Sequence, residues 1–176
     1  MLFIYLFICI FIGPGVSSPF GFRCLYPITQ TSIAVTLTSI LASMDPSGIA
    51  APLLQSEITS DEKELMKLKN DKRMGPSNVS NKSAYEILKL VADAKVELSN
   101  VKVPFLVIHG DIDQISLIEG GQYLYDNAGS SSNKKQIIVI ANGKHELLHE
   151  VTEIKSVAMI AIVNYFENQF NSIKKE

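Results

Sequence analysis

Along the carboxyl-terminal half of the chain, short apolar runs alternate with longer amphipathic stretches. The runs 103–108 and 136–140 are nearly continuous in apolar residues, a pattern typical of strands buried on both faces of a parallel sheet. Amphipathic helices are predicted at 83–98, 117–128 and 153–170, where apolar residues recur at helical spacing. Strands and helices follow one another as in right-handed parallel crossover units, so this half is predicted to be α/β.

The pattern before residue 84 is different. Residues 28–44 predict an apolar, uncharged helix that ends where Asp45-Pro46-Ser47-Gly48 supplies proline and glycine. This helix is either an ordinary core helix or part of a lid that faces a lipid-like substrate. Residues 57–83 then change to a charged, solvated helix and loop, for which Ser60 is the expected N-cap.

The first twelve residues are the most apolar stretch in the chain, and three interpretations apply to them. They are too few to span a bilayer alone, which takes roughly 20 residues. A secretory signal would have its cleavage region at 13–18, but the positively charged segment expected ahead of the apolar one is missing. The third interpretation is a buried strand that ends in the turn Gly13-Pro14-Gly15.

Composition limits the classes of function. A chain of 176 residues with 47% hydrophobic content and a net charge of −2 can bury one ordinary core, which predicts a single domain. Without a basic excess, nucleic acid is not an expected partner. Cys9 and Cys24 fit neither a disulfide framework nor a zinc site. Asn78 and Asn81 begin the glycosylation acceptor pattern, which matters only in a secreted protein.

Candidate catalytic groups follow both predicted strands. Asp111 and Asp113 come after the first strand, and His145 comes after the second. Parallel sheets carry their chemistry just beyond the carboxyl ends of the strands, so an acid and a histidine in these places indicate a relay pair without its nucleophile. Asp111 is interpreted as a turn residue, because an offset of one residue points its side chain elsewhere.

A second chemistry also uses two aspartates after a strand. In magnesium-dependent phosphatases such carboxylates hold the metal, but there the first aspartate follows the strand directly, whereas His109-Gly110 intervenes here. No other acidic cluster supplies ligands, so no metal and no other cofactor is expected. His109 and His149 are interpreted as structural, and Glu150 is expected to help start the last helix.

These residues also form a recognisable set. Val103 to Asp113, followed by Gly143 to Glu150 before a final helix, closely resembles the carboxyl-terminal half of monoglyceride lipase-like α/β-hydrolases, a group that includes lysophospholipases and the serine aminopeptidase S33 domain. In that family, P-x-L-x-x-H-G-x-x-D ends in the triad acid and the first histidine of G-x-H-x-x-x-H is the triad base. Residue by residue, these roles fall on Asp113 and His145. The resemblance covers about residues 84–170.

The resemblance also implies a division of the chain. Residues 1–18 would be the apolar strand that precedes the family's lid, with the signal or anchor segment as the alternative. Residues 19–98 would be the helical lid and a connecting helix, and residues 99–176 the carboxyl-terminal core of an α/β-hydrolase fold. The amino-terminal strands, the oxyanion-hole loop and the nucleophile elbow would then be missing.

The nucleophile elbow has the pattern G-x-S-x-G, which does not occur in this sequence. The resemblance therefore implies a serine hydrolase of the monoacylglycerol lipase or lysophospholipase type that cleaves a carboxylic ester of a lipid, here as a fragment that is inactive alone. The alternative is a non-catalytic remnant that acts as a binding module or pseudoenzyme.

The partners that the resemblance implies are a lipid ester substrate and, through the lid, the surface of a membrane. The compartment stays open: cytoplasmic or membrane-associated is favoured, and secretory applies if residues 1–12 are a signal.

Overall fold

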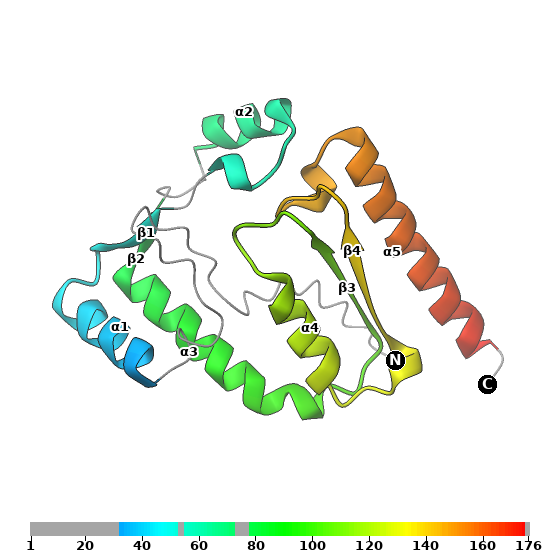
Figure 1. Ribbon diagram of the computed structural model, residues 1–176, viewed down its shortest axis with the longest axis horizontal. Helices are drawn as coiled ribbons and strands as arrows, with labels where there is room; N and C mark the ends of the chain where they lie inside the picture. The colour runs from blue at the N-terminus through cyan, green and yellow to red at the C-terminus, as the bar shows by residue number, and fades with distance from the viewer. Residues whose placement is uncertain (1–31, 53–54, 73–77, 175–176) are drawn as a thin grey trace.

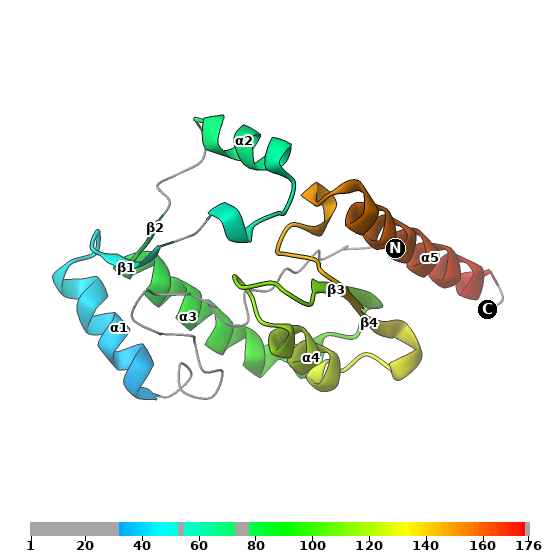
Figure 2. The ribbon, with the colours of Figure 1, turned by 45° about the horizontal axis from the view of Figure 1, so that its top comes forward.

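A parallel pair of strands with a helix on each side forms the carboxyl-terminal part of the molecule (Figure 1). The computed structural model describes residues 32–52, 55–72 and 78–174. Strands β3 and β4 pair in parallel, with Val107 opposite Ile137, and α4 makes the crossover between them. The views of Figures 1 and 2 agree that α4 and α5 flank the strand pair. The bounds are β3 (Phe105–Gly110), α4 (Ile118–Asn127), η3 (Ser132–Lys134), β4 (Lys135–Ile140), η4 (Leu147–His149) and α5 (Thr152–Ile173).

Each face of this strand pair carries its own small core, as expected when neighbouring side chains of a strand point to opposite faces. On one face Val107 packs with residues of α4 and of the helix that precedes β3; on the other, Ile140 packs with α5. The α/β expectation and both predicted strands are confirmed. Burial on both faces is incomplete, because Val139 in β4 is 51% exposed. The buried residues are Val91, Leu98, Val107, Leu124 and Ala128 on the first face, and Ile140, Leu147 and Ala158 on the second.

A second group of elements precedes the strand pair and joins it through the long helix α3. Helix α1 packs against α3, and the short strands β1 and β2 pair antiparallel beside them. The Asn81 side chain donates to the carbonyl oxygen of Asp45 over 2.8 Å, which ties the end of α1 to the start of α3. The bounds are α1 (Ser32–Met44), β1 (Ile49–Pro52), η1 (Gln55–Glu57), α2 (Glu62–Asn70), β2 (Asn78–Ser80), α3 (Asn81–Glu97) and η2 (Leu98–Asn100).

Two features of this group differ from the sequence expectations. The β1–β2 ribbon was not predicted, because strands of four and three residues are too short to show an alternating pattern. The N-cap of α2 is Asp61 rather than Ser60, and its carboxylate accepts from the backbone N–H groups of Lys63 and Glu64. An aspartate satisfies two otherwise unpaired donors at this end of the helix, so the start moves by one residue.

The apolar helix predicted at 28–44 is present over its described part, as α1. Ala42 is buried, whereas Leu37, Leu41 and Met44 are exposed, so α1 has an open apolar face among the described residues. None of the helices that the structure describes combines the length and the apolar character needed to cross a bilayer. The apolar segment 1–18, with its three interpretations, lies outside the described residues.

Candidate active site

The loops that follow β3 and β4 lie against each other at the carboxyl end of the strand pair. The backbone N–H of Asp111 donates to the carbonyl oxygen of Ile140 over 3.1 Å, and that of Ile112 donates to Gly143 over 3.2 Å. A Cβ atom on Gly110 would fall on the backbone carbonyl of Gly143, so this approach requires glycine. The two loops therefore bring their side chains to one place.

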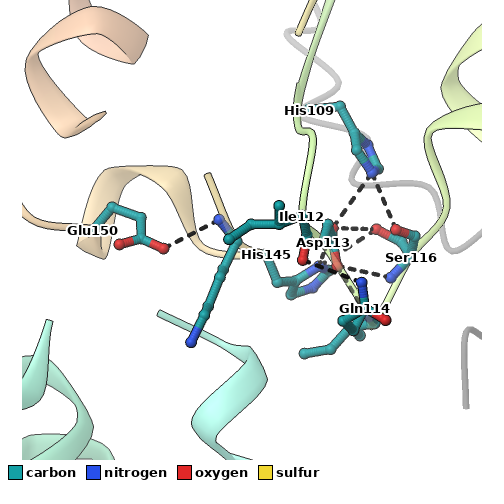
Figure 3. Close-up of polar contacts among 9 residues, drawn as sticks. His109, Ile112, Asp113, Gln114, Ser116, His145 and Glu150 are labelled. Atoms are coloured by element: carbon teal, nitrogen blue, oxygen red, sulfur yellow. Dashed lines mark hydrogen bonds and ion pairs between the residues drawn. The ribbon is translucent and has the colours of Figure 1, made fainter. Parts of the chain in front are cut away.

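Asp113 is buried in the first of these loops, and both oxygens of its carboxylate accept hydrogen bonds. Oδ1 accepts from the backbone N–H groups of Ile115 over 2.8 Å and Ser116 over 3.0 Å. Oδ2 accepts from the Ser116 hydroxyl over 2.7 Å and from Nδ1 of His145 over 2.9 Å. Protein donors thus hold the carboxylate in one orientation, with one oxygen directed at His145 (Figure 3).

His145 comes from the second loop, and its side chain is only 10% exposed. A carboxylate only accepts hydrogen bonds, so Nδ1 is the donor in its contact with Asp113. In the neutral ring this leaves Nε2 as the basic nitrogen. The pair therefore sets the imidazole in the tautomer that a general base needs.

Burial and hydrogen bonding oppose each other in this pair. Burial alone would raise the pKa of Asp113, but hydrogen bonds from His145 and Ser116 outweigh it and hold that pKa below its ordinary value. Burial alone would lower the pKa of His145, but the hydrogen bond to Asp113 and its negative charge raise it above the ordinary value, with a smaller contribution from Glu146. The arrangement therefore favours the charged form of each group.

Other sequence-predicted residues fall in different places. Asp111 is exposed in the turn after β3. His109 lies closer to the site than expected: its Nε2 is 3.1 Å from the carbonyl oxygen of Ser116 and 3.5 Å from Oδ2 of Asp113. His149 is exposed, with Nδ1 3.4 Å from the carboxylate of Glu146.

Ser116 is the site residue that sequence reasoning missed. Its backbone N–H and its hydroxyl contact different oxygens of Asp113. The available signal was its position three residues after the aspartate, since aspartate commonly accepts from backbone groups two and three residues ahead in a turn.

Glu150 also differs from its expected role. It contacts the N–H of Val151 over 3.3 Å, but Val151 caps α5 without a side-chain hydrogen bond. The shorter contacts of Glu150 run to the N–H groups of Ser60 and Lys144. Its carboxylate therefore links separate segments as well as lying beside the start of α5.

The two aspartates after β3 lie in different surroundings: Asp111 is exposed, whereas Asp113 is buried. Across residues 32–52, 55–72 and 78–174, no group of three or more His, Cys, Asp or Glu side chains is placed to hold a metal ion. Both oxygens of Asp113 accept hydrogen bonds from N–H or O–H donors. These contacts hold the carboxylate in position to orient the ring of His145.

Comparisons with known proteins match most of the chain. Residues 8–152 match the family model described as Serine aminopeptidase, S33. Among curated proteins, the monoglyceride lipase homolog of monkeypox virus is 22% identical over 135 residues, which cover 77% of this chain and 47% of that protein.

Two solved structures share the fold of the described elements. The crystal structure of Paleococcus ferrophilus monoacylglycerol lipase aligns with a TM-score of 0.62 at 20% identity, covering 77% of this chain and 51% of the lipase. A soluble variant of monoglyceride lipase from Saccharomyces cerevisiae, in complex with a substrate analog, aligns with a TM-score of 0.59 at 16% identity, covering 80% of this chain and 50% of the lipase. The chain thus spans about half the length of the relatives it matches.

Proposed function

This chain belongs to the serine aminopeptidase S33 family and forms part of an α/β-hydrolase fold, and on that premise we propose that it supplies the acid and the base of a serine-hydrolase triad that cleaves a carboxylic ester of a lipid. The observation that carries this proposal is the 2.9 Å contact between Asp113 and His145 at the carboxyl end of two parallel strands. Acid and base at this edge are what a nucleophilic relay requires.

Each residue has a defined task in the proposed reaction. As a serine oxygen bonds to the ester carbonyl carbon, His145 takes the serine proton on Nε2 and returns it to the departing alcohol. A water molecule then attacks the acyl-enzyme with the same proton transfers and releases the carboxylic acid. Asp113 holds the imidazole tautomer and stabilises the imidazolium that forms.

On this proposal the nucleophile lies outside these 176 residues, because the G-x-S-x-G pattern does not occur among them. The oxyanion donors lie outside them too. The described residues by themselves then provide a base without a serine to activate, so we expect no turnover from this chain alone.

The lipid ester substrate rests on two observations. The relatives carry the names monoglyceride lipase and monoacylglycerol lipase, and α1 has an open apolar face of the kind that contacts acyl chains. Residues 19–98 then serve as lid and connecting helix, and residues 99–176 as the catalytic half of the core.

A second candidate function is a non-catalytic binding module. The absence of the elbow pattern from the 176 residues favours it. It predicts a protein that folds and binds lipid without forming an acyl-enzyme.

Mass and probe labelling of the endogenous protein separate the two functions. The protein is captured with an antibody against residues 99–176, its intact mass is measured, and it is treated with a fluorophosphonate that labels activated serines. A species above 19.4 kDa that labels supports the hydrolase, provided that His145→Ala abolishes labelling and His149→Ala retains it. The second variant is a matched control, because His149 lies in the same loop but is exposed. An unlabelled species of 19.4 kDa would overturn the hydrolase and favour the binding module.

A further inference from the structure

The backbone on each side of His145 is held by contacts that do not involve Asp113. The N–H of Lys144, directly before it, donates to Oε1 of Glu150 over 3.1 Å. The N–H of Glu146, directly after it, donates to the carbonyl oxygen of Ile58 over 2.8 Å. Figure 3 shows Glu150 and Asp113 on opposite sides of His145. The position of the histidine is therefore set from two directions.

The same segment around Ile58 is bound to Glu150 and its neighbour. Oε2 of Glu150 accepts from the backbone N–H of Ser60 over 3.0 Å, 90 positions away in the chain. Thr59 is fully buried, and its hydroxyl donates to the carbonyl oxygen of His149 over 2.7 Å. We call these contacts of residues 58–60 with residues 144–150 the clasp.

We propose that Glu150 is a positioning residue for His145. Through the clasp, segment 58–60 fixes the orientation of the His145 side chain; this segment leads into α2. Its catalytic consequence rests on the proposed function, whereas its geometric consequence does not. Segment 58–60 lies within residues 19–98, the proposed lid and connecting helix. The packing of this region against residues 144–150 and the orientation of the His145 ring are therefore coupled.

The chemistry of the clasp requires a carboxylate at position 150. Both of its oxygens face backbone N–H donors, and the residue is 3% exposed, so water does not replace a lost contact. A glutamine offers one acceptor oxygen and turns an NH₂ group towards the other donor. Glu150→Gln must therefore release either Lys144 or Ser60.

Nitrogen-15 NMR of the full chain tests the geometry directly. The chain contains only three histidines, so the imidazole resonances can be assigned to individual residues. In the parent protein we expect a hydrogen-bonded Nδ1–H resonance from His145. Glu150→Gln should weaken or abolish that resonance and shift the titration midpoint of His145, while circular dichroism stays unchanged. Glu146→Gln is the matched control for the resonance. It removes an equal charge from the residue next to His145, which lowers the pKa of His145, but it leaves the clasp contacts in place, so the Nδ1–H resonance should remain. An unchanged His145 resonance in Glu150→Gln would overturn the proposal.

A second pair of variants keeps the test decisive if Glu150→Gln does not fold. Thr59→Val keeps the volume but removes the hydroxyl, whereas Thr59→Ser keeps the hydroxyl. The clasp predicts that valine disturbs the His145 resonance and serine does not. Equal spectra for the two variants would contradict it.

Probe labelling of the endogenous protein adds the catalytic readout. Glu150→Gln should slow fluorophosphonate labelling on the order of 100-fold, the scale of a small misplacement of a catalytic group, and leave substrate KM nearly unchanged. If the parent protein never labels but Glu150→Gln moves the His145 resonance, the proposed function fails and the clasp stands. If the parent labels and Glu150→Gln labels equally fast with an unmoved resonance, the clasp fails and the function stands.

Discussion

Oδ2 of Asp113 lies 2.9 Å from Nδ1 of His145, although the two residues are 32 positions apart in the chain. The parallel pairing of β3 and β4 brings the two loops together. The close approach of Gly110 to Gly143 then brings the side chains of Asp113 and His145 within hydrogen-bonding distance. This contact is the basis of the predictions below.

The first prediction concerns the pKa of His145. We expect it to lie above the ordinary value of 6.5: burial lowers this pKa, but the hydrogen bond to Asp113, the charge of its carboxylate and a smaller contribution from Glu146 together outweigh burial. Asp113→Asn removes that charge and leaves the burial, so the pKa should fall below 6.5. Histidine NMR over a pH series measures both values. A midpoint that is the same in the two proteins would contradict the pairing.

The second prediction concerns stability and pH. The raised pKa of His145 gives a stabilisation that is complete below pH 6.5 and is lost as the pH rises through the folded-state pKa. The lowered pKa of Asp113 gives a stabilisation that is present above pH 3.8 and is lost as the pH falls through its folded-state pKa.

The pair should therefore stabilise the fold most between pH 3.8 and pH 6.5. Urea unfolding across this range and above it should show the difference between the parent and Asp113→Asn shrinking at alkaline pH. Asp111→Asn, in the exposed turn, is the control and should show no such trend.

The third prediction concerns Ser116. Ser116→Ala removes a 2.7 Å hydrogen bond to the buried carboxylate of Asp113, and a hydrogen bond to a charged group contributes about 1.5–3 kcal/mol. We expect a loss of this size in the free energy of unfolding in urea, together with a higher pKa of Asp113. Ser131→Ala removes a comparable hydroxyl contact at an exposed position and should cost less than about 0.5 kcal/mol. Equal losses in the free energy of unfolding for the two variants would show that the Ser116 hydroxyl contributes no more to stability than an exposed hydroxyl.

The fourth prediction concerns Gly110. Gly110→Ala places a methyl group on the carbonyl of Gly143, so the two loops must move apart. We expect destabilisation of about 1–3 kcal/mol, as for other overpacked sites, and loss of the His145 Nδ1–H resonance. Asp111→Ala changes the adjacent exposed residue and should leave the resonance in place. Retention of the resonance in Gly110→Ala would mean that the loops tolerate separation.

The sequence predicted the elements whose residues carry a local pattern. β3 and β4 are short apolar runs, α3, α4 and α5 show helical spacing, and all of them are present. Such patterns arise because apolar residues occupy the one or two faces of a helix or strand that are buried away from water. Asp113 and His145 were predicted as site residues from their places just beyond the ends of these two strands.

Only the tertiary structure decided the contacts between distant segments. The β1–β2 ribbon, the hydroxyl of Ser116 on Asp113 and the bond from Ser60 to Glu150 have little or no signature along the chain. The position of Glu150 in the sequence predicts a residue that helps to start the last helix, yet its carboxylate accepts a hydrogen bond from Ser60, 90 positions away. Hydrogen bonds of this kind form where packing happens to bring a donor to an acceptor, and a one-dimensional pattern of polar and apolar residues does not encode that meeting.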